Sequence, residues 1–260
     1  MARIIAIANQ KGGVGKTTTT MNLGAALVRM GKKVLMIDTD SQDGNLTTAC
    51  GIDEDLVEVT TAHYLAAIIE NEGITDKNYW LEDVIHHKEG FDLIPCNKLL
   101  SQFELSGVFN DRNDLLREYI SKIEDCYDFI LIDCPPTLGL ITINGFVASD
   151  SVLIPTEAAY LAAKGTQSLL DIIASIKQSA NPRLRIMGIL LTKVDKRCSF
   201  PMQMIDLFHQ TYGQDIKVFD FFVPFSVKFP ESNAMGISNF KHNPSGKGTA
   251  MYDKLAKELV

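Results

Sequence analysis

The sequence lacks long apolar runs, paired cysteines and any excess of positive charge. No stretch approaches the roughly 18 consecutive apolar residues that cross a bilayer. The opening residues MARIIAIANQ show no charged leader followed by an apolar core and a cleavage site, so a secretory signal is not expected. The five cysteines are scattered without a CxxC pair, which is typical of reduced thiols and not of a disulfide framework. We therefore expect a cytoplasmic protein.

The charge balance makes the chain a poor general binder of polyanions. It has 25 lysines and arginines against 32 aspartates and glutamates, a formal net charge of −7. Any contact with nucleic acid must therefore come from a local basic patch, which a dimer would present twice. The 46% of hydrophobic residues exclude a disordered or collagen-like polymer. Because no internal repeat and no long linker is present, the sequence predicts a single domain over residues 1–260.

Short apolar runs alternate with longer helical stretches along the chain. Five runs are compact and apolar, as expected of strands that are covered on both faces: Arg3–Ala8, Val34–Ile37, Phe129–Ile132, Val152–Ile154 and Ile186–Leu191. Between the first two, residues 17–30 carry apolar side chains at helical spacing, and a glycine follows as a stop. Repetition of this βαβ unit predicts a doubly wound α/β fold, with a mostly parallel sheet and helices on both faces.

The polar stretch from Asp53 to Asp125 has no comparable pattern. Its residues indicate helices around Ala62–Glu70 and Asp111–Ile123, and we expect the stretch to lie beside the sheet as an elaboration. A last helix is expected from Gly248 to Leu259.

A glycine-rich loop, NQKGGVGKTT at residues 9–18, joins the first predicted strand to the first predicted helix. Its glycines let successive backbone N–H groups turn inward around phosphate oxygens, and the helix directs its positive end at the same point. Lys16 can then reach the β- and γ-phosphates, while the Thr17 hydroxyl ligates Mg²⁺. The candidate nucleotide-binding residues of the loop are Lys11, Gly12, Gly13, Val14, Gly15, Lys16, Thr17 and Thr18.

Two details of this loop bear on its assignment. The general pattern GxxxxGK[ST] has glycine where this chain has Gln10, and Lys11 follows at the mouth of the loop. A dinucleotide site is the alternative, since Asp38 lies about 20 residues further on and could bind a ribose hydroxyl. That fingerprint requires glycine or alanine at the position of Thr18, and it leaves Lys16 without a function.

The motif KGGVGKTT, with a lysine at its start, resembles the deviant Walker A box of the ParA/MinD group of P-loop ATPases. Further segments are similar to the ParA/Soj partition branch of that group: VLMIDTDSQ, YDFILIDCPPTLGLITINGFVASDSVLIP, MGILLTKVD and GKGTAMYDKLAKEL. Together they span most of the chain and leave mainly residues 53–125 unmatched. The resemblance implies an ATPase that uses ATP and Mg²⁺ and forms a homodimer when ATP is bound.

Three aspartates follow or end predicted strands, at the edge of the sheet where ligands bind in open α/β folds. Asp133 stands where a Walker B carboxylate would hold Mg²⁺ directly or through water. Asp38 and Asp40 follow the second strand and point the same way in a period-2 segment, so we expect both to line the phosphate site. By resemblance, Asp40 positions the attacking water and Asp38 helps with the metal. The alternatives are that Asp133 only caps the loop after it, and that one of the pair only caps a helix.

The segment after the second strand departs from the family pattern DxDPQGN. This chain reads DTDSQDGN, in which Ser41 replaces a proline and Asp43 looks inserted. Losing the fixed φ of the proline ring loosens the segment, and we expect this to affect the rate of hydrolysis.

By the same resemblance, Lys11 crosses a dimer interface and touches the partner's nucleotide. There its charge would stabilise the transferring phosphoryl group, as an arginine finger does. A monomer would then bind ATP but hydrolyse it slowly. The alternative is a lysine that only faces solvent.

The nucleotide base is expected near Thr192 and Pro224. Residues 192–195 read TKVD and resemble NKxD, the guanine-reading motif of GTPases, with Thr192 in the place of asparagine. Within the resembling family the base is adenine, contacted largely by backbone near this segment and near Pro224. We therefore expect ATP rather than GTP.

The resemblance also implies that the ATP-bound dimer binds DNA without sequence preference, with a dependence on salt. Lys228 occupies a family position that is usually arginine. Other basic candidates cluster in one segment, at Arg183, Arg185, Lys193, Lys196 and Arg197. The alternative for each is a solvated face. A ParB-like, centromere-binding partner would stimulate hydrolysis, and the nucleoid-associated dimer would help to segregate a plasmid, chromosome or mobile element.

Other functions of related folds are alternatives. A MinD-like or scaffold-positioning switch would not bind DNA, and no basic amphipathic tail follows the last expected helix, so no membrane role is expected. An iron–sulfur reductase would use a pair of cysteines, for which Cys96 and Cys134 are candidates, although core packing suits both better. An ATP-dependent amidotransferase or carboxylase would release a small-molecule product together with ADP.

Overall fold

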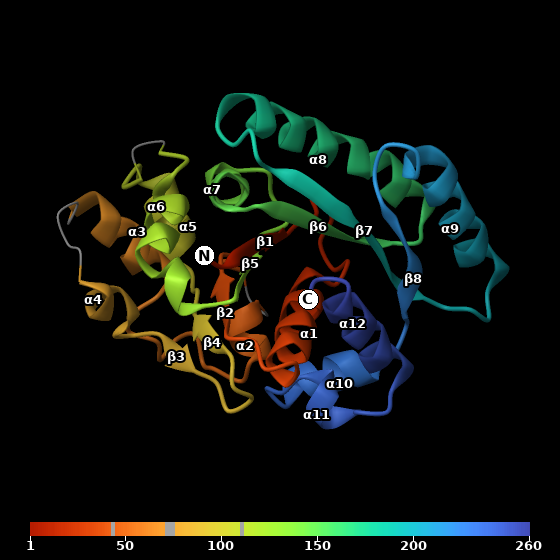
Figure 1. The fold of residues 1–260 in the computed structure, drawn as a ribbon, viewed down its shortest axis with the longest axis horizontal. Helices are drawn as coiled ribbons and strands as arrows, with labels where there is room; N and C mark the ends of the chain where they lie inside the picture. Colours follow the sequence, from red (N-terminus) through yellow and green to blue (C-terminus); the bar gives the residue numbers. More distant parts are fainter. Residues whose placement is uncertain (43–44, 71–75, 110–111) are drawn as a thin grey trace.

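The computed structural model describes residues 1–42, 45–70, 76–109 and 112–260, with the backbone alone at 160–164 (Figure 1). Its described strands form one eight-stranded sheet. In spatial order they are β3 (Ile85–His86), β4 (Asp92–Ile94), β2 (Val34–Asp38), β5 (Phe129–Asp133), β1 (Arg3–Ile7), β6 (Ser151–Glu157), β7 (Arg185–Val194) and β8 (Val218–Pro224). All five strands predicted from the sequence are present, with somewhat different ends.

Neighbouring strands of the described sheet run parallel, except for the β3–β4 pair. Strand β1 is central, so Ile7 at its end pairs with Asp133 of β5 and with Leu153 of β6. Asp38 at the end of β2 pairs with Asp133 in turn. Because parallel strands end at the same edge of a sheet, the loops that follow them meet there. This edge carries the candidate site.

Alternate side chains of the central strands enter two apolar layers, one on each face of the sheet. In β1, Ile4 and Ala6 join one layer, while Ile5 and Ile7 join the other. The first layer is covered by α3 (Thr61–Glu70), α4 (Lys77–Leu81), α5 (Leu99–Leu105), α6 (Leu115–Ile123), α7 (Leu140–Ala148), α8 (Tyr160–Ser179) and α9 (Ser199–Tyr212). The second is covered by α1 (Lys16–Arg29), α2 (Leu46–Ala49), α10 (Lys228–Ala234), α11 (Asn239–His242) and α12 (Lys247–Lys257). The predicted doubly wound fold is therefore confirmed.

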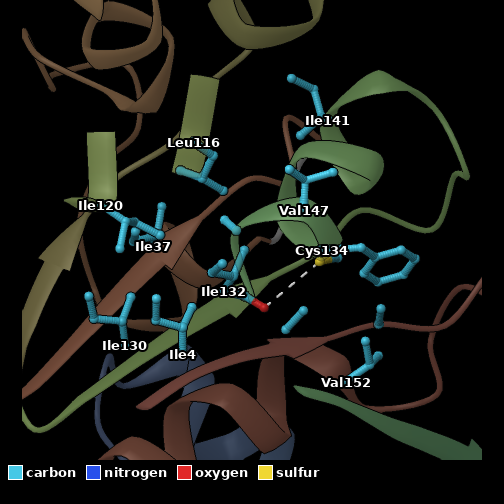
Figure 2. Packing of buried hydrophobic residues seen from close by; sticks show 14 of the residues in the cluster. Ile4, Ile37, Leu116, Ile120, Ile130, Ile132, Cys134, Ile141, Val147 and Val152 are labelled. Atoms are coloured by element: carbon cyan, nitrogen blue, oxygen red, sulfur yellow. Dashed lines mark hydrogen bonds between the residues drawn. The ribbon is translucent and has the colours of Figure 1, made fainter. Parts of the chain in front are cut away.

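Cys134 is enclosed in the first layer, between β5 and helices α6 and α7 (Figure 2). Its sulfur lies 3.9 Å from the carbonyl oxygen of Ile132, and Leu116 and Val147 belong to the same layer. Cys96 is buried in this layer as well. Both thiols are buried in the core, as expected.

The structure corrects the interpretation of residues 53–125 as an elaboration beside the sheet. Strand β4 extends the sheet itself, because Leu35 of β2 pairs in parallel with Asp92 of β4. Strand β3 then adds an antiparallel edge. These strands have two and three residues, too few for an alternating pattern to show in the sequence.

The helix predicted to begin at Asp111 begins at Leu115 in the structure. Asp111 itself lies outside the described residues. Just before the helix, the guanidinium group of Arg112 forms ion pairs with Asp114 and Glu118, at 3.1 and 2.7 Å. Among the helices that the structure describes, none is both long and apolar enough to cross a membrane.

Candidate functional site

A cavity of about 460 Å³ opens at the edge where the parallel strands end. Its volume is in the range of small-molecule sites. The predicted residues that line it are Gly12, Gly13, Gly15, Lys16, Thr17, Thr18, Asp40, Thr192 and Pro224. Four further predicted residues belong to the surrounding structure without lining it: Lys11, Val14, Asp38 and Asp133. The fold thus brings together the glycine-rich loop and the ends of β2, β7 and β8.

The glycine-rich loop has a backbone that glycine accommodates readily. Gly13 and Gly15 have φ angles of 74° and 91°, and no atom lies within 4 Å of the place where a Cβ would stand. The left-handed backbone, and not crowding, therefore favours glycine here. Helix α1 begins directly after Gly15, which leaves the first N–H groups of the helix for a bound anion.

Two side chains fasten the loop to the sheet. The buried Thr192 hydroxyl donates a 2.7 Å hydrogen bond to the carbonyl oxygen of Val14. The Asn9 amide donates to the carbonyl oxygen of Pro155 at 2.8 Å and to the Thr156 hydroxyl at 3.0 Å. Thr192, predicted near the base, thus also holds the loop. The sequence did not single out Asn9, because one asparagine after a strand carries no distinctive signal.

Lys16 is buried, with 6% of its surface exposed. No residue in the described part of the chain forms an ion pair with it. A buried cation without a paired carboxylate is unfavourable, and an anionic ligand relieves that cost. Lys16 therefore fits its predicted role as a phosphate-binding lysine.

Asp133 is fully buried at the end of β5, where hydroxyl groups of α1 hold both of its oxygens. Thr17 donates to Oδ2 at 2.7 Å, and Thr20 donates to Oδ1 at 3.0 Å. Burial raises the pKa of Asp133 to about 7, although Thr17 and Lys16 favour its charged form. Mg²⁺ bound to nucleotides takes oxygen ligands of this kind together with phosphate oxygens. Thr17 and Asp133 fit the predicted metal site, and Thr20 is a supporting residue that the sequence did not reveal.

The expectation that Asp38 and Asp40 both line the phosphate site holds for Asp40 alone. Asp40 lines the cavity, and burial raises the pKa of its carboxyl against the opposing effects of the Gln42 N–H and Lys16. Asp43, which looked inserted in this segment, lies outside the described residues.

Asp38 is fully buried behind Asp40 and faces α2 instead. Its Oδ2 accepts hydrogen bonds from the Thr47 N–H at 2.8 Å and the Thr47 hydroxyl at 2.6 Å. Its Oδ1 accepts a 3.0 Å hydrogen bond from the Asp40 N–H. Burial and the nearby Asp133 raise the pKa of Asp38 well above its usual value. Thr47 lies in the first turn of α2, but the N-cap of that helix is Asn45, so Asp38 accepts a hydrogen bond from the turn without being its N-cap.

Lys11 projects from the mouth of the loop, and 47% of its side chain is exposed. Its amino group forms an ion pair with Glu157, the last residue of β6. Lys193, near the end of β7, lies 3.5 Å from the other Glu157 oxygen. The sequence pointed to Lys11 but not to Glu157, because the predicted strand ended at Ile154.

The C-terminal part of the chain supplies a cavity wall that the sequence did not predict. Phe229, Asn233 and Tyr252 line the cavity together with Pro224. The buried Tyr252 hydroxyl lies 3.0 Å from the Thr19 hydroxyl in α1. These two residues are 233 positions apart, so no local pattern could connect them.

Some basic residues that we expected to meet DNA are paired with carboxylates in this structure. The Arg197 guanidinium group contacts both oxygens of Asp195, and Lys228 lies 2.7 Å from Glu231. Arg185, at the start of β7, is exposed. The basic surface is therefore partly neutralised within the chain itself.

Several solved structures share this fold over the whole chain, among them the following two. Cobyrinic acid a,c-diamide synthase from Mycobacterium smegmatis, with a bound ATP analogue and magnesium, aligns with a TM-score of 0.83 at 30% identity. The alignment covers 100% of this chain and 94% of that one. The septum site-determining protein MinD from Pyrococcus horikoshii, complexed with Mg-ADP, aligns with a TM-score of 0.76 at 28% identity. It covers 100% of this chain and 96% of that one.

The parallel sheet, the phosphate-binding loop after β1 and the carboxylate that ends β5 define a P-loop nucleotide-hydrolysing protein. A family model described as an AAA domain matches residues 2–186. The sporulation initiation inhibitor protein Soj from Bacillus subtilis is 38% identical, over 100% of this chain and 99% of that protein. The chain belongs to this AAA-domain family and to the ParA/MinD group of P-loop ATPases. It is an ATPase that uses ATP and Mg²⁺.

Proposed function

We propose that the chain is a ParA-like partition ATPase whose ATP-bound homodimer binds DNA without sequence preference. A ParB-like, centromere-binding protein stimulates hydrolysis and so releases the dimer from DNA. The cycle helps to segregate a plasmid, chromosome or mobile element, with the ATP-bound form on the nucleoid. One observation carries the proposal: a half-exposed lysine, Lys11, stands at the mouth of a phosphate-binding cavity, in a chain similar to Soj over its full length.

Each residue around the cavity has a proposed part in hydrolysis. Lys16 and the backbone N–H groups of the loop bind the β- and γ-phosphates. Thr17 and Asp133 hold Mg²⁺, which neutralises charge that develops on the phosphates. Asp40 positions the attacking water, because it is the aspartate of this segment that faces the cavity. Asp38 supports the metal site from the neighbouring strand, where it pairs with Asp133, and its Oδ1 fixes Asp40 by accepting a hydrogen bond from the Asp40 N–H.

Lys11 completes the site of the partner subunit. Phosphoryl transfer depends mainly on positioning and on stabilising negative charge, so a lysine delivered by a second subunit adds what a monomer lacks. Hydrolysis is thereby linked to dimerisation. The base binds between Thr192 and Pro224, which line one cavity with the loop.

The test measures the size of the protein and its binding to DNA in the same samples. With ATP and Mg²⁺ we expect dimers that shift a DNA fragment at low salt and release it at high salt. With ADP or without nucleotide we expect monomers and no shift. Lys16→Ala should behave as the nucleotide-free protein does in every sample. A wild-type protein that stays monomeric with ATP would contradict the proposal.

Two alternatives are distinguished by the same samples. A MinD-like or scaffold-positioning switch would form ATP-dependent dimers that leave DNA unshifted even at low salt. The second alternative is an amide-forming enzyme, since this chain is 30% identical to the cobyrinic acid a,c-diamide synthase from Mycobacterium smegmatis. That activity would convert a carboxyl group of a substrate to an amide with nitrogen from a donor, as ATP is split to ADP and phosphate, and mass spectrometry would detect the amide product.

A further inference from the structure

Three charged side chains, from the loop after β1 and from the ends of β6 and β7, meet at the mouth of the cavity. The carboxylate of Glu157 contacts the amino group of Lys11 through Oε2 and that of Lys193 through Oε1, the latter at 3.5 Å. About a quarter of the Glu157 side chain is exposed, against about half of each lysine side chain. The Glu157 carboxylate thus forms ion pairs with two lysines. One of them, Lys11, is the residue that we propose to act in the partner's site.

The backbone presents Lys11 to Glu157. The Asn9 side chain accepts a 2.9 Å hydrogen bond from the Lys11 N–H and donates to Pro155 and Thr156 near the end of β6. The start of the loop is therefore clamped to the strand that ends in Glu157. The backbone positions of Lys11 and Glu157 are therefore fixed relative to each other by the fold, unlike those of two long side chains that form an ion pair on a mobile surface.

Lys193 is held at Glu157 by an unusual backbone conformation. Its φ of 53° is the only positive value at a non-glycine position in the described chain. The preceding residue, Thr192, pairs with Glu157 across β6 and β7 and is anchored on Val14. A left-handed lysine persists only where its surroundings impose it, and such positions are common at functional sites.

We propose that Glu157 is a positioning residue that holds Lys11 within its own subunit, and that Lys193 competes with Lys11 for the same carboxylate. The inference rests on the proposed role of Lys11 in the partner's site. To reach the partner, Lys11 must leave Glu157, so this ion pair opposes dimerisation. Lys193 then remains as the counter-ion of the Glu157 carboxylate, so that the carboxylate keeps an ion-pair partner after Lys11 has left.

The electrostatics of Glu157 agree with a shared counter-ion. Burial by itself would disfavour the charged carboxylate, but contacts with Lys11 and Lys193 outweigh it and hold the pKa of Glu157 below its usual value. Partly exposed ion pairs of this kind change an equilibrium by about two- to fivefold. A symmetric dimer releases two of them, so the combined effect on dimerisation is about four- to 25-fold.

The experiment measures the dimer dissociation constant of the full chain by sedimentation, with a saturating non-hydrolysable ATP analogue and Mg²⁺. Glu157→Gln keeps the shape and removes the charge, and it should lower the constant by about four- to 25-fold. Lys193→Gln should act in the opposite direction, because Glu157 then binds Lys11 alone. Asp206→Asn on α9 removes the same charge elsewhere and should leave the constant unchanged.

Two further variants separate positioning from a general structural role. Glu157→Asp retains the charge and should restore most of the wild-type constant. In a Lys11→Ala background, Glu157→Gln should have no further effect, since the residue that it holds is gone. Thermal unfolding without nucleotide shows whether each variant folds. If Glu157→Gln does not fold, the effect of Lys193→Gln on the dissociation constant still tests the proposal.

The outcomes are distinguishable. If Glu157→Gln weakens the dimer or leaves it unchanged, or if Lys193→Gln tightens it, the competition does not exist. If wild-type protein forms no dimer with the ATP analogue, the proposed function fails, and the inference falls with it.

Discussion

Replacing Thr192 with valine tests whether a single buried hydroxyl holds the phosphate-binding loop in place. The hydroxyl donates a 2.7 Å hydrogen bond to the carbonyl oxygen of Val14, and the two residues are 2% and 0% exposed. Valine has nearly the same shape but no donor, so the carbonyl loses its partner away from water. A buried polar group left without a partner costs about 1–3 kcal/mol. With a cost of about 2 kcal/mol, the Tm of a chain of this size falls by about 4–8 °C.

The same cost can appear in ATP binding if the loop moves so that the Val14 carbonyl reaches water. The N–H groups beside it then lose their alignment, and about 2 kcal/mol corresponds to a roughly 30-fold weaker Kd for ATP. Thermal unfolding without nucleotide and calorimetry with ATP and Mg²⁺ measure the two effects separately. Thr192→Ser keeps the hydroxyl and serves as the matched control. A Thr192→Val protein with unchanged Tm and unchanged Kd would refute this account of the loop.

Three further predictions concern other parts of the molecule. Asp40→Ala should leave ATP-dependent dimers intact and slow phosphate release by at least about 100-fold, and normal hydrolysis would remove Asp40 from its proposed role. Glu231→Gln frees Lys228 and should strengthen DNA binding about two- to fivefold at low salt, with no difference at high salt, as measured by fluorescence anisotropy. Burial lowers the pKa of His87 below its usual 6.5, and its neutral ring accepts a hydrogen bond from the Glu89 N–H. In the unfolded chain His87 is protonated as the pH falls through about 6.5, whereas in the folded chain it stays neutral to a lower pH. The free energy of unfolding therefore decreases as the pH drops below about 6.5. His87→Phe should reduce this loss in urea unfolding at pH 7.5 and pH 5, and an identical loss in both proteins would contradict the assignment.

The sheet was predictable where its strands are covered on both faces. Runs such as Phe129–Ile132 stand out because both faces of a central parallel strand are apolar. Strand β8 escaped prediction, because at the edge of the sheet it carries the exposed Asp220 among its buried residues. Strands β3 and β4 escaped because they are too short to form a pattern.

The candidate site was predictable where its chemistry is local. The glycines, Lys16 and Thr17 belong to one continuous loop, so their spacing alone indicated a phosphate site. The two aspartates of the next segment looked equivalent, because the alternation of a strand does not tell which of two carboxyls a later helix will cover. Thr47 settles the difference, since its N–H and hydroxyl bind Asp38 and leave Asp40 at the cavity.

The sequence by itself determined the phosphate-binding loop, the alternation of strands and helices, and the carboxylates that follow the strands. These are properties of neighbouring residues, and short-range sterics and apolar spacing decide them. Only the tertiary structure decided that Glu157 holds Lys11 and that Tyr252 stands against α1. Such contacts join residues far apart in the chain, and they depend on the order of the strands in the sheet, which no local pattern of residues encodes.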